Sequence, residues 1–448
     1  GYRIDEWVAV WLDDEQVREV TGVDHEESGG EILQVGKTNR SINVPSGTIR
    51  YDDVVFEIPA IANIWVDGVH GDDNNDGTSA GRAFRTIQKA ADLAGPGTTV
   101  HILPGLYRET VRPAAGGTPG QPVLFLAENG PGTAVVRGSE AASSLEWTQL
   151  TANSIGLPPG IDPGQIYFTD FSSWGSTATP RFVVELDGAG HVAARLPLAH
   201  EPDWNVQKLW KQHEFWWAAD GGSAIAACDP ATDPNSDCDL PSRSMTLLTD
   251  TRDDNLPAGV EGGNLTTLGD LTGATLVAMD AYQGHYMYRR RIVSHDVAAG
   301  QVTVDEACQH GTGVPGLGWG SKYFVEGAPQ LLDTPGEWWY DSESGRLYLW
   351  PRTPGNPGLE NVEISWREMG FDLSHRSYVT LDGLEIEFFN GNAINQTNSV
   401  GSRSAGNVLR GMQMRYANRG VYLNQGVGAG AEEITAGFRL EGSEIGYM

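Results

Sequence analysis

Carboxylate side chains recur at matching positions in three similar segments of the sequence, 379–387, 408–415 and 439–446. Alternate residues of a strand point to opposite faces, so placing Leu381, Leu384 and Ile386 inward turns their acidic neighbours outward, with the intervening glycine allowing a local irregularity. The predicted outward carboxylates are Asp382, Glu385, Glu387, Glu441 and Glu444.

Stacking the segments predicts which outward side chains are neighbours. Adjacent parallel strands lie ~4.8 Å apart, so Glu385 and Glu444, two strands apart, would be ~9.6 Å apart at the backbone. Inverting glycosidases hold their two carboxyl groups ~6.5–9.5 Å apart. Glu385 and Glu444, with Asp382 and Glu441 as neighbours, are therefore candidates for the catalytic acid and base. The alternative is a salt-bridge ladder on a solvated face. The predicted columns are Asp382–Arg410–Glu441, Glu385–Gln413–Glu444 and Glu387–Arg415–Gly446.

The elements that must position these carboxylates repeat along the chain. Gly383, Gly411 and Gly442 are 28 and 31 residues apart. A period of 20–50 residues with one strand-like core per unit indicates a solenoid, in which each coil buries its apolar residues against the next. The sequence stops inside the third unit, and because solenoids need caps, we expect more sequence to follow.

Two stretches resemble a known superfamily. "VDGVHGDDNNDGTSAGRAFRTIQKAADLAGPGTTVHILPGLYRETVRP", followed by "PVLFLAENGPGTAVVRGSE", resembles the N-terminal cap and first coils of right-handed parallel β-helix proteins of the pectin-lyase-like superfamily. "APQLLDTPGEWWYDSESGRLYLWP" (328–351) resembles a landmark of its glycoside-hydrolase-like branch, which carries a β-rich insertion between coils. The resemblance covers about residues 62–448. It implies an all-β fold, a parallel β-helix whose N-terminal opening is covered by a helix at 84–94.

The chain divides into parts of different character. Residues 1–57 alternate like strands and resemble the last strands of a laminin-G-like or concanavalin-like β-sandwich, which predicts a C-terminal remnant of such a module. Residues 58–63 are the predicted linker, and 64–448 the β-helix. Within it, residues 145–329 have no detectable period and are rich in Trp, Pro and Gly, which favours a β-rich insertion.

One acidic loop has calcium-ligand spacing. Asp72, Asn74 and Asp76 match the first half of an EF-hand loop, with Gly77 at its sixth position. Ala83 stands where the bidentate Glu is expected, so a structural turn is the alternative. We expect no required cofactor beyond this possible structural Ca²⁺.

Clustered aromatic residues favour a surface that stacks on sugar rings. We expect the 204–217 segment to overhang the carboxylate columns; the alternative is core packing of a loop-rich insertion. The candidate sugar-stacking residues are Trp204, Trp210, Trp216, Trp217 and Trp319.

Composition narrows the partners and the compartment. A formal net charge of −29 would be repelled by nucleic acids and anionic lipid surfaces. Cys228 and Cys238 bracket a short loop and predict a disulfide, with Cys308 left over, which favours a secreted or cell-surface protein. Any leader peptide would lie outside the sequence.

These observations predict a secreted carbohydrate-active protein, foremost a glycoside hydrolase that acts on a polysaccharide. A polysaccharide lyase is an alternative, with Arg289–Arg291, Tyr286 and Tyr288 as its nearest candidate groups. A non-catalytic glycan-binding or adhesion protein is the third possibility. The sequence leaves the oligomeric state open.

Overall fold

The fold is described from a computed structural model, which separates into two compact units, Gly1–Ala60 and Ile61–Met448. In the first unit, β1 (Val8–Leu12) pairs antiparallel with β2 (Glu15–Val20). The β-sandwich assignment of this unit stays a prediction. The residues that the structure describes are 8–12, 15–20, 62–171, 179–203, 216–219, 246–251, 263–279, 286–310, 314–318, 321–357, 361–398, 404–424 and 437–446.

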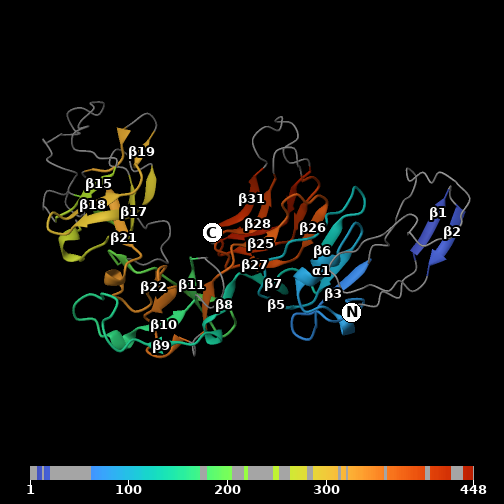
Figure 1. Cartoon of the computed structure of the whole chain (residues 1–448), viewed down its shortest axis with the longest axis horizontal. Helices are drawn as coiled ribbons and strands as arrows, with labels where there is room; N and C mark the ends of the chain where they lie inside the picture. The colour runs from blue at the N-terminus through green and yellow to red at the C-terminus, as the bar shows by residue number, and fades with distance from the viewer. Residues whose placement is uncertain are drawn as a thin grey trace, which may run out of the picture. The chain divides into compact units, whose positions relative to one another are not determined.

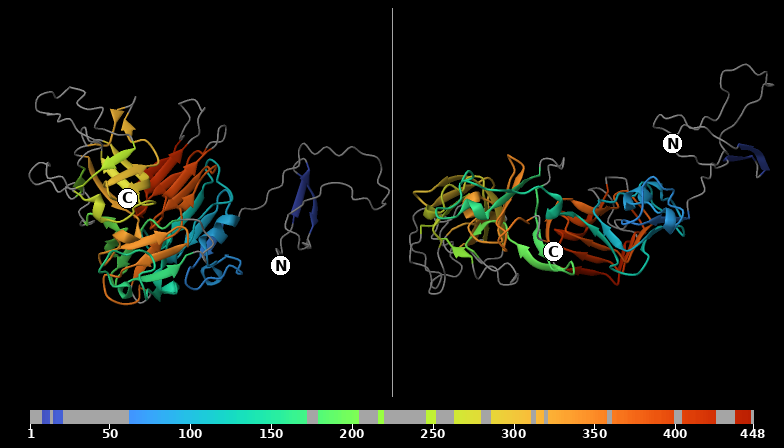
Figure 2. Two further views of the ribbon diagram at one scale, coloured as in Figure 1. Left: turned by 60° about the vertical axis from the view of Figure 1, so that its left-hand side comes forward. Right: turned by 90° about the horizontal axis from the view of Figure 1, so that it is seen from below.

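The second unit is mostly β-structure and contains three parallel sheets (Figures 1 and 2). From β25 to β30 the chain visits the three sheets in turn, so equivalent strands of successive turns pair side by side. The first parallel sheet contains β3 (Asn63–Val66), β4 (Thr99–Ile102), β6 (Val123–Ala127), β26 (Val379–Asp382), β29 (Val408–Arg410) and β32 (Arg439–Glu441). The second contains β5 (Gly105–Tyr107), β7 (Ala134–Arg137), β27 (Glu385–Glu387), β30 (Gln413–Arg415) and β33 (Glu444–Gly446). The third contains β25 (Met369–Asp372), β28 (Asn392–Thr397) and β31 (Arg419–Asn424).

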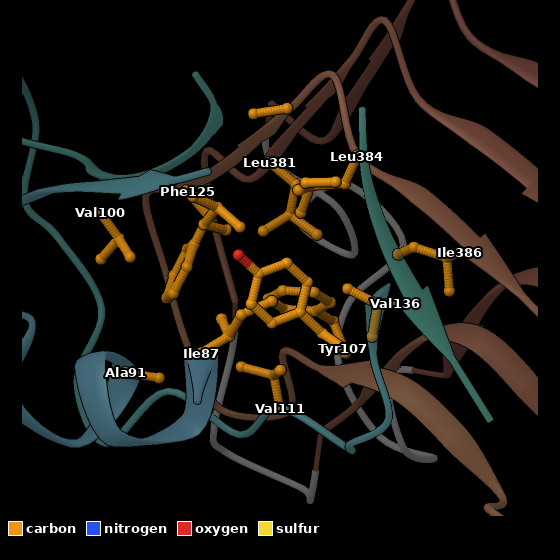
Figure 3. Packing of buried hydrophobic residues seen from close by; sticks show 14 of the residues in the cluster. Ile87, Ala91, Val100, Tyr107, Val111, Phe125, Val136, Leu381, Leu384 and Ile386 are labelled. Atoms are coloured by element: carbon orange, nitrogen blue, oxygen red, sulfur yellow. The ribbon is translucent and has the colours of Figure 1, made fainter. Parts of the chain in front are cut away.

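Apolar side chains from these sheets meet in one core. Alternation along β6 buries Val123, Phe125 and Ala127 and leaves the residues between them partly exposed. Phe125 pairs with Leu381 although 256 residues separate them, and both lie in the core around Tyr107 (Figure 3). This pairing joins the turns before and after the insertion into one continuous stack.

Helix α1 (Ile87–Leu93) packs against the start of the first parallel sheet, within the predicted range 84–94. The Thr86 side chain accepts a hydrogen bond from the Lys89 backbone N–H, which caps the first turn. The Glu109 carboxylate accepts two further backbone N–H groups there, from Ile87 and Gln88. Free N–H groups at a helix start favour such an anion.

Antiparallel sheets occupy the stretch between β7 and β25 (Figure 1), and their strands extend on both sides of the predicted 145–329. The sheet that follows β7 contains β8 (Ser139–Ala141), β11 (Val183–Leu186), β12 (Val192–Leu196) and β24 (Val362–Ser365). A second contains β9 (Thr148–Gln149), β10 (Tyr167–Asp170), β22 (Trp338–Asp341) and β23 (Arg346–Leu349). A third contains β13 (His200–Glu201), β14 (Trp217–Ala218), β15 (Leu247–Thr249), β16 (Thr275–Met279), β17 (Met287–Asp296), β18 (Gln301–Val304) and β21 (Lys322–Glu326), and β19 (Gln309–His310) pairs with β20 (Val314–Pro315).

Candidate functional site

The predicted carboxylate columns form on the outer faces of two parallel sheets. Glu385 pairs with Gln413, and Gln413 pairs with Glu444, across β27, β30 and β33. In the neighbouring sheet, Arg410 lies between Asp382 and Glu441. Leu381, Leu384 and Ile386 are fully buried in the core, so the predicted inward face is confirmed. Of the carboxylates predicted to point outward, Glu387 is an exception: it is 6% exposed, because it pairs with Arg137 where the insertion meets the parallel sheets.

The glycines of the repeat shape the corner between these sheets. Gly383, Gly411 and Gly442 have φ angles of 75°, 58° and 54°. Residues with a side chain rarely adopt this left-handed conformation, whereas glycine does so at little cost. Each corner therefore takes only two residues, which places Asp382 and Glu385 close to one edge.

Arginines bridge the carboxylates along each column. Arg415 Nη1 lies 3.4 Å from Glu385 Oε1, and its Nη2 lies 3.3 Å from Glu444 Oε2. Arg410 Nη1 lies 3.6 Å from Asp382 Oδ2, and its Nε lies 3.8 Å from Glu441 Oε2. The salt-bridge ladder that the sequence offered as an alternative is thus present in the geometry.

The two predicted catalytic carboxylates differ in environment. The Glu385 side chain is 16% exposed, whereas that of Glu444 is 60% exposed. Burial raises the pKa of Glu385, although the positive charges of Arg415, Arg137 and His191 partly oppose this effect. Glu385 is therefore suited to hold a proton, and Glu444 to face water.

A buried ionic network lies beside Glu385, where the insertion leaves the parallel sheets. Arg108 donates hydrogen bonds of 2.7 and 2.8 Å to the two carboxylate oxygens of Glu363 on β24. Arg137 contacts the same carboxylate at 3.2 Å and also pairs with Glu387. Ser139 donates a further hydrogen bond to Glu363. The network joins β7 and β27 to the antiparallel sheet of β24.

Burial and pairing act in opposite directions on the two acids of this network. Burial would raise the pKa of Glu363, but the hydrogen bonds and charge of Arg108, with Ser139 and Arg137, outweigh it and lower that pKa. Burial raises the pKa of Glu387 in spite of Arg137. The carboxylate with more donors is thus the better stabilised anion.

The β11–β12 hairpin and two aromatic residues approach the same face. Phe388 and Tyr416 follow β27 and β30, and their rings stack with centroids 5.0 Å apart. Both residues have positive φ angles, 58° and 51°, which is unusual for bulky side chains. Arg137 lies over the Phe388 ring. Tyr416 lies near enough to Arg195 of β12 to raise the pKa of that arginine against the effect of burial.

The sequence reasoning did not assign a role to Arg108, Arg137, Glu363, Arg195 or Tyr416. Glu363 lies 226 residues after Arg137 along the chain, so no local pattern links the two. One sequence signal could have pointed to this aromatic pair. Phe388 follows Glu387 and Tyr416 follows Arg415, at matching positions of two successive repeats.

The described part of the predicted aromatic surface packs inside the insertion. Trp216 is 4% exposed and packs edge-on against Phe324, and Trp217 packs against Tyr323. These contacts favour the core-packing alternative. Their sheet, which contains β21, lies at the end of the unit away from β27, with β22 and β11 between them (Figures 1 and 2), so Trp216 and Trp217 do not overhang the carboxylate columns. Trp204, Trp210 and Trp319 lie outside the described residues.

A second polar cluster lies in the insertion, around β13. Glu337 Oε1 accepts a 3.1 Å hydrogen bond from the His200 backbone N–H and lies 3.0 Å from His200 Nδ1. Its Oε2 accepts the backbone N–H groups of Asp333 and Thr334. Burial raises the pKa of Glu337 to about 7, although His200 opposes the effect.

Glu201, next to His200, is surrounded by acids. Burial, and then the charges of Asp203 and Asp333, raise the pKa of Glu201 to about 7. Two sets of groups place ligand atoms within 4.8 Å of one another, a spacing that a divalent cation can bridge. These sets are His200 with Asp203 and Glu337, and Glu201 with Asp203 and Asp333.

The acidic loop near the N-terminal cap forms side-chain-stabilised turns. Asp72 Oδ1 accepts hydrogen bonds from the backbone and the side chain of Asn74. Asp76 bonds to Thr78 through one oxygen and to Arg82 through the other. The turn alternative accounts for these contacts, and Ca²⁺ binding by Asp72, Asn74 and Asp76 stays a prediction.

Of the remaining sequence candidates, some are paired or buried within the insertion, Tyr286 and Arg291 are exposed, and others lie outside the described residues. Arg289 pairs with Glu326, and Tyr288 is buried in the core of the insertion. Cys308 is free and buried. Cys228 and Cys238 lie outside the described residues, so their disulfide stays a prediction.

Comparison with known proteins bears on the insertion first. Residues 313–352 match the GH141 insertion domain. This segment contains β21, β22 and β23, and it supplies Asp333 and Glu337 to the cluster around His200. It overlaps the stretch 328–351 that resembled a glycoside-hydrolase landmark, and it supports a relationship with glycoside hydrolases.

Other similarities are partial. The chain is 37% identical over 78 residues to the "Uncharacterized protein YwoF" of Bacillus subtilis (strain 168), which is 17% of this chain and 16% of that protein. A solved "Glycoside hydrolase" aligns with a TM-score of 0.45 at 13% identity, covering 79% of this chain and 67% of that one. "The complex structure of XylC with xylose" aligns with a TM-score of 0.31 at 12% identity, covering 84% and 56%. Structural similarity at this level does not assign a function.

Among the described residues, no helix is long and apolar enough to cross a lipid bilayer.

Proposed function

We propose that this protein is a glycoside hydrolase that acts on a polysaccharide. The match of residues 313–352 to the GH141 insertion domain is the observation that carries this proposal. The parallel sheets add outward carboxylates, one partly buried and one exposed. Glycoside hydrolysis requires two carboxyl groups in different environments, one as acid and one as base or nucleophile. Secretion and the Cys228–Cys238 disulfide belong to the same proposal.

The proposal includes the architecture that holds the site. Successive turns of the chain contribute paired parallel strands to three sheets, and the insertion interrupts the stack between β7 and β25. This topology supports a right-handed parallel β-helix of the pectin-lyase-like kind. Such a scaffold fixes the spacing between Glu385 and Glu444 by strand pairing rather than by loops.

In the proposed mechanism, Glu385 is the general acid. Burial raises the pKa of its carboxyl, and in the reaction the protonated carboxyl gives its proton to the glycosidic oxygen as the bond to the anomeric carbon breaks. Glu444, paired with Arg415, accepts a proton from the water that attacks the opposite face of the sugar. Because two strand spacings separate these residues, ~9.6 Å at the backbone, the reaction should invert the anomeric configuration.

The test uses Glu385→Gln and Glu444→Gln in the 448-residue chain, assayed for new reducing ends on neutral and acidic polysaccharides. Removing a positioned acid or base should lower kcat by about 10²–10⁴-fold. Glu343→Gln, an exposed glutamate in the turn between β22 and β23, is the control and should retain activity. Unchanged turnover in both Glu385→Gln and Glu444→Gln would show that the columns are only a salt-bridged surface.

The same assay separates the alternatives. A polysaccharide lyase would release unsaturated uronates, which absorb in the ultraviolet, and its turnover would survive both substitutions. A non-catalytic glycan-binding protein would be slowed by polysaccharide in affinity electrophoresis and would release no new reducing ends. Of the arginines that the lyase alternative would use, Arg289 pairs with Glu326 and Arg290 with Glu306.

A further inference from the structure

We propose that Arg195 recognises an anionic substituent of the polysaccharide, a carboxylate or a sulfate ester, beside the row of carboxylates. This inference rests on the proposed function, because it adds a specificity determinant to the same site. It predicts an acidic polysaccharide as the substrate of a strongly acidic protein.

Arg195 stands out because, in the described part of the chain, its guanidinium has neither an anionic partner nor a hydrogen bond, whereas half-buried Arg376 donates to the Pro113 carbonyl. It is half-buried on β12, and its guanidinium lies over the Phe182 ring, 4.8 Å from the ring centroid. Burial lowers its pKa, and among the described residues the Tyr416 side chain acts against this. By contrast, Arg108, Arg137, Arg367 and Arg415, also partly or fully buried, each pair with a carboxylate.

A partly buried arginine without a carboxylate is costly, and this protein has 59 acidic residues with which it could have paired. Arginine stays charged in proteins, so the cost is not avoided by losing a proton. A planar guanidinium with unused donors fits the two oxygens of a carboxylate or sulfate. The stacked Phe182 ring holds that plane in one orientation.

Strand register places Arg195 on the face that looks toward the candidate site. Arg195 pairs with Val184, and Val184 pairs with Glu363, so all three lie in one row across the sheet. Glu363, which pairs on its other side with Ala141 of β8, contacts Arg137 on β7 through its carboxylate. Two strand spacings separate Arg195 from Glu363, ~9.6 Å at the backbone. Arg195 is thus carried toward Tyr416, which directly follows β30.

The surroundings explain why the proposed ligand is an anion on a sugar rather than a free anion. Glu385 and Glu444 flank Arg415 on the same outer face, and their negative charges would repel a small anion. A substrate bound along the sheet brings its substituent to Arg195 while its glycosidic bond lies near Glu385. The neutral sugar ring and the charged group then meet different parts of one face.

The test compares Arg195→Gln with the unsubstituted chain in binding to paired polysaccharides, measured by titration calorimetry. The carboxylate arm uses polygalacturonate and glucuronoxylan beside their carboxyl-reduced forms. The sulfate arm uses chondroitin sulfate beside its desulfated form, so the two sources of negative charge are distinguished. Arg352→Gln is the control, since Arg352 pairs with Glu185 on the same antiparallel sheet.

We expect the unsubstituted chain to bind at least one charged polysaccharide about tenfold more tightly than its neutral counterpart. Arg195→Gln should lose that preference and keep the affinity for the neutral form, whereas Arg352→Gln should keep both. Equal affinity for charged and neutral forms in the unsubstituted chain would overturn the inference and leave the hydrolase proposal intact. A preference that survives Arg195→Gln would overturn it as well. If no polysaccharide is bound or cleaved, the proposed function fails together with the inference.

Discussion

The parallel sheets and the insertion place their charged groups in different ways. On the parallel sheets, Asp382, Arg410 and Glu441 stand in register at the surface and neutralise one another at 3.6–3.8 Å. In the insertion, Glu337 is 1% exposed, pairs with His200, and accepts hydrogen bonds from the backbone N–H groups of Asp333 and Thr334. In the repeated strands, Asp382, Arg410 and Glu441 stay in contact with water. In the irregular loops of the insertion, a buried charged group satisfies backbone N–H groups.

This difference has energetic consequences. An exposed ladder of ion pairs contributes little, because water and salt screen each pair. A buried network is costly to assemble and more costly to break, because removing one partner leaves a buried charge without its counterion. The junction of Arg137, Glu363 and Glu387 is a buried network that joins the two regions, since Arg137 and Glu387 lie on parallel strands and Glu363 lies in the insertion.

The largest effect should come from breaking that junction. Arg137→Met removes the cation that Glu363 and Glu387 share and leaves Glu387 buried without a partner. We expect the free energy of unfolding, measured by urea denaturation at pH 7, to fall by about 3–5 kcal/mol. Because protonating the buried acids relieves the penalty, the loss should be smaller at pH 5. A loss below about 1 kcal/mol would contradict the assignment of this junction as a buried network.

The corner glycines should show the next largest effect. Gly383→Ala forces a side chain into a left-handed conformation, which costs about 1–2 kcal/mol. Its Cβ would also lie 3.3 Å from Ala127 Cβ, a tight contact, whereas nothing lies within 4 Å of a Cβ at Gly442. Gly442→Ala is therefore the matched control for backbone strain alone. Urea denaturation should show Gly383→Ala as the more destabilised variant, and equal losses would mean that crowding at Gly383 is relieved.

Glu201→Gln should stabilise the protein at high pH. The folded-state pKa of Glu201 is raised to about 7, above its unfolded value, so the folded protein binds more protons than the unfolded chain between about pH 4.5 and 7. Stability from this group is therefore present at low pH and lost as the pH rises through 7. At pH 8 the variant should melt about 2 °C above the unsubstituted chain, and at pH 5 the two should melt together. Glu343→Gln, at an exposed position in the turn between β22 and β23, is the control for replacing a Glu by Gln.

Much of the repeated part could be predicted from the sequence, and the reason is physical. The period of the glycines and the alternation of Leu381 and Ile386 with acidic residues are local patterns, and each corresponds to one corner and one strand of the structure. The columns then followed from stacking alone. The register Glu385–Gln413–Glu444 is the same in the sequence analysis and in the structure.

The rest of the candidate site arises from contacts that no local pattern encodes. Arg108 meets Glu363 across 255 residues, and Arg195 lies within electrostatic range of Tyr416, which is on a distant part of the chain. The tryptophans misled for a related reason. Trp216 and Trp217 belong to an aromatic cluster in the sequence, but their burial depends on β21, more than a hundred residues later.

The smallest effect should come from the exposed ladder. Arg410→Gln removes the charge between Asp382 and Glu441, but the Arg410 side chain is 53% exposed and both of its ion pairs are longer than 3.5 Å. Water replaces such a partner at little cost, so urea denaturation should show a change within about 0.5 kcal/mol, which 1 M salt should abolish. Arg137→Met is the buried counterpart on the same kind of strand. If Arg410→Gln lowered the free energy of unfolding as much as Arg137→Met, the exposed ladder would stabilise the fold as strongly as the buried network. The distinction between exposed and buried charge in this fold would then not hold.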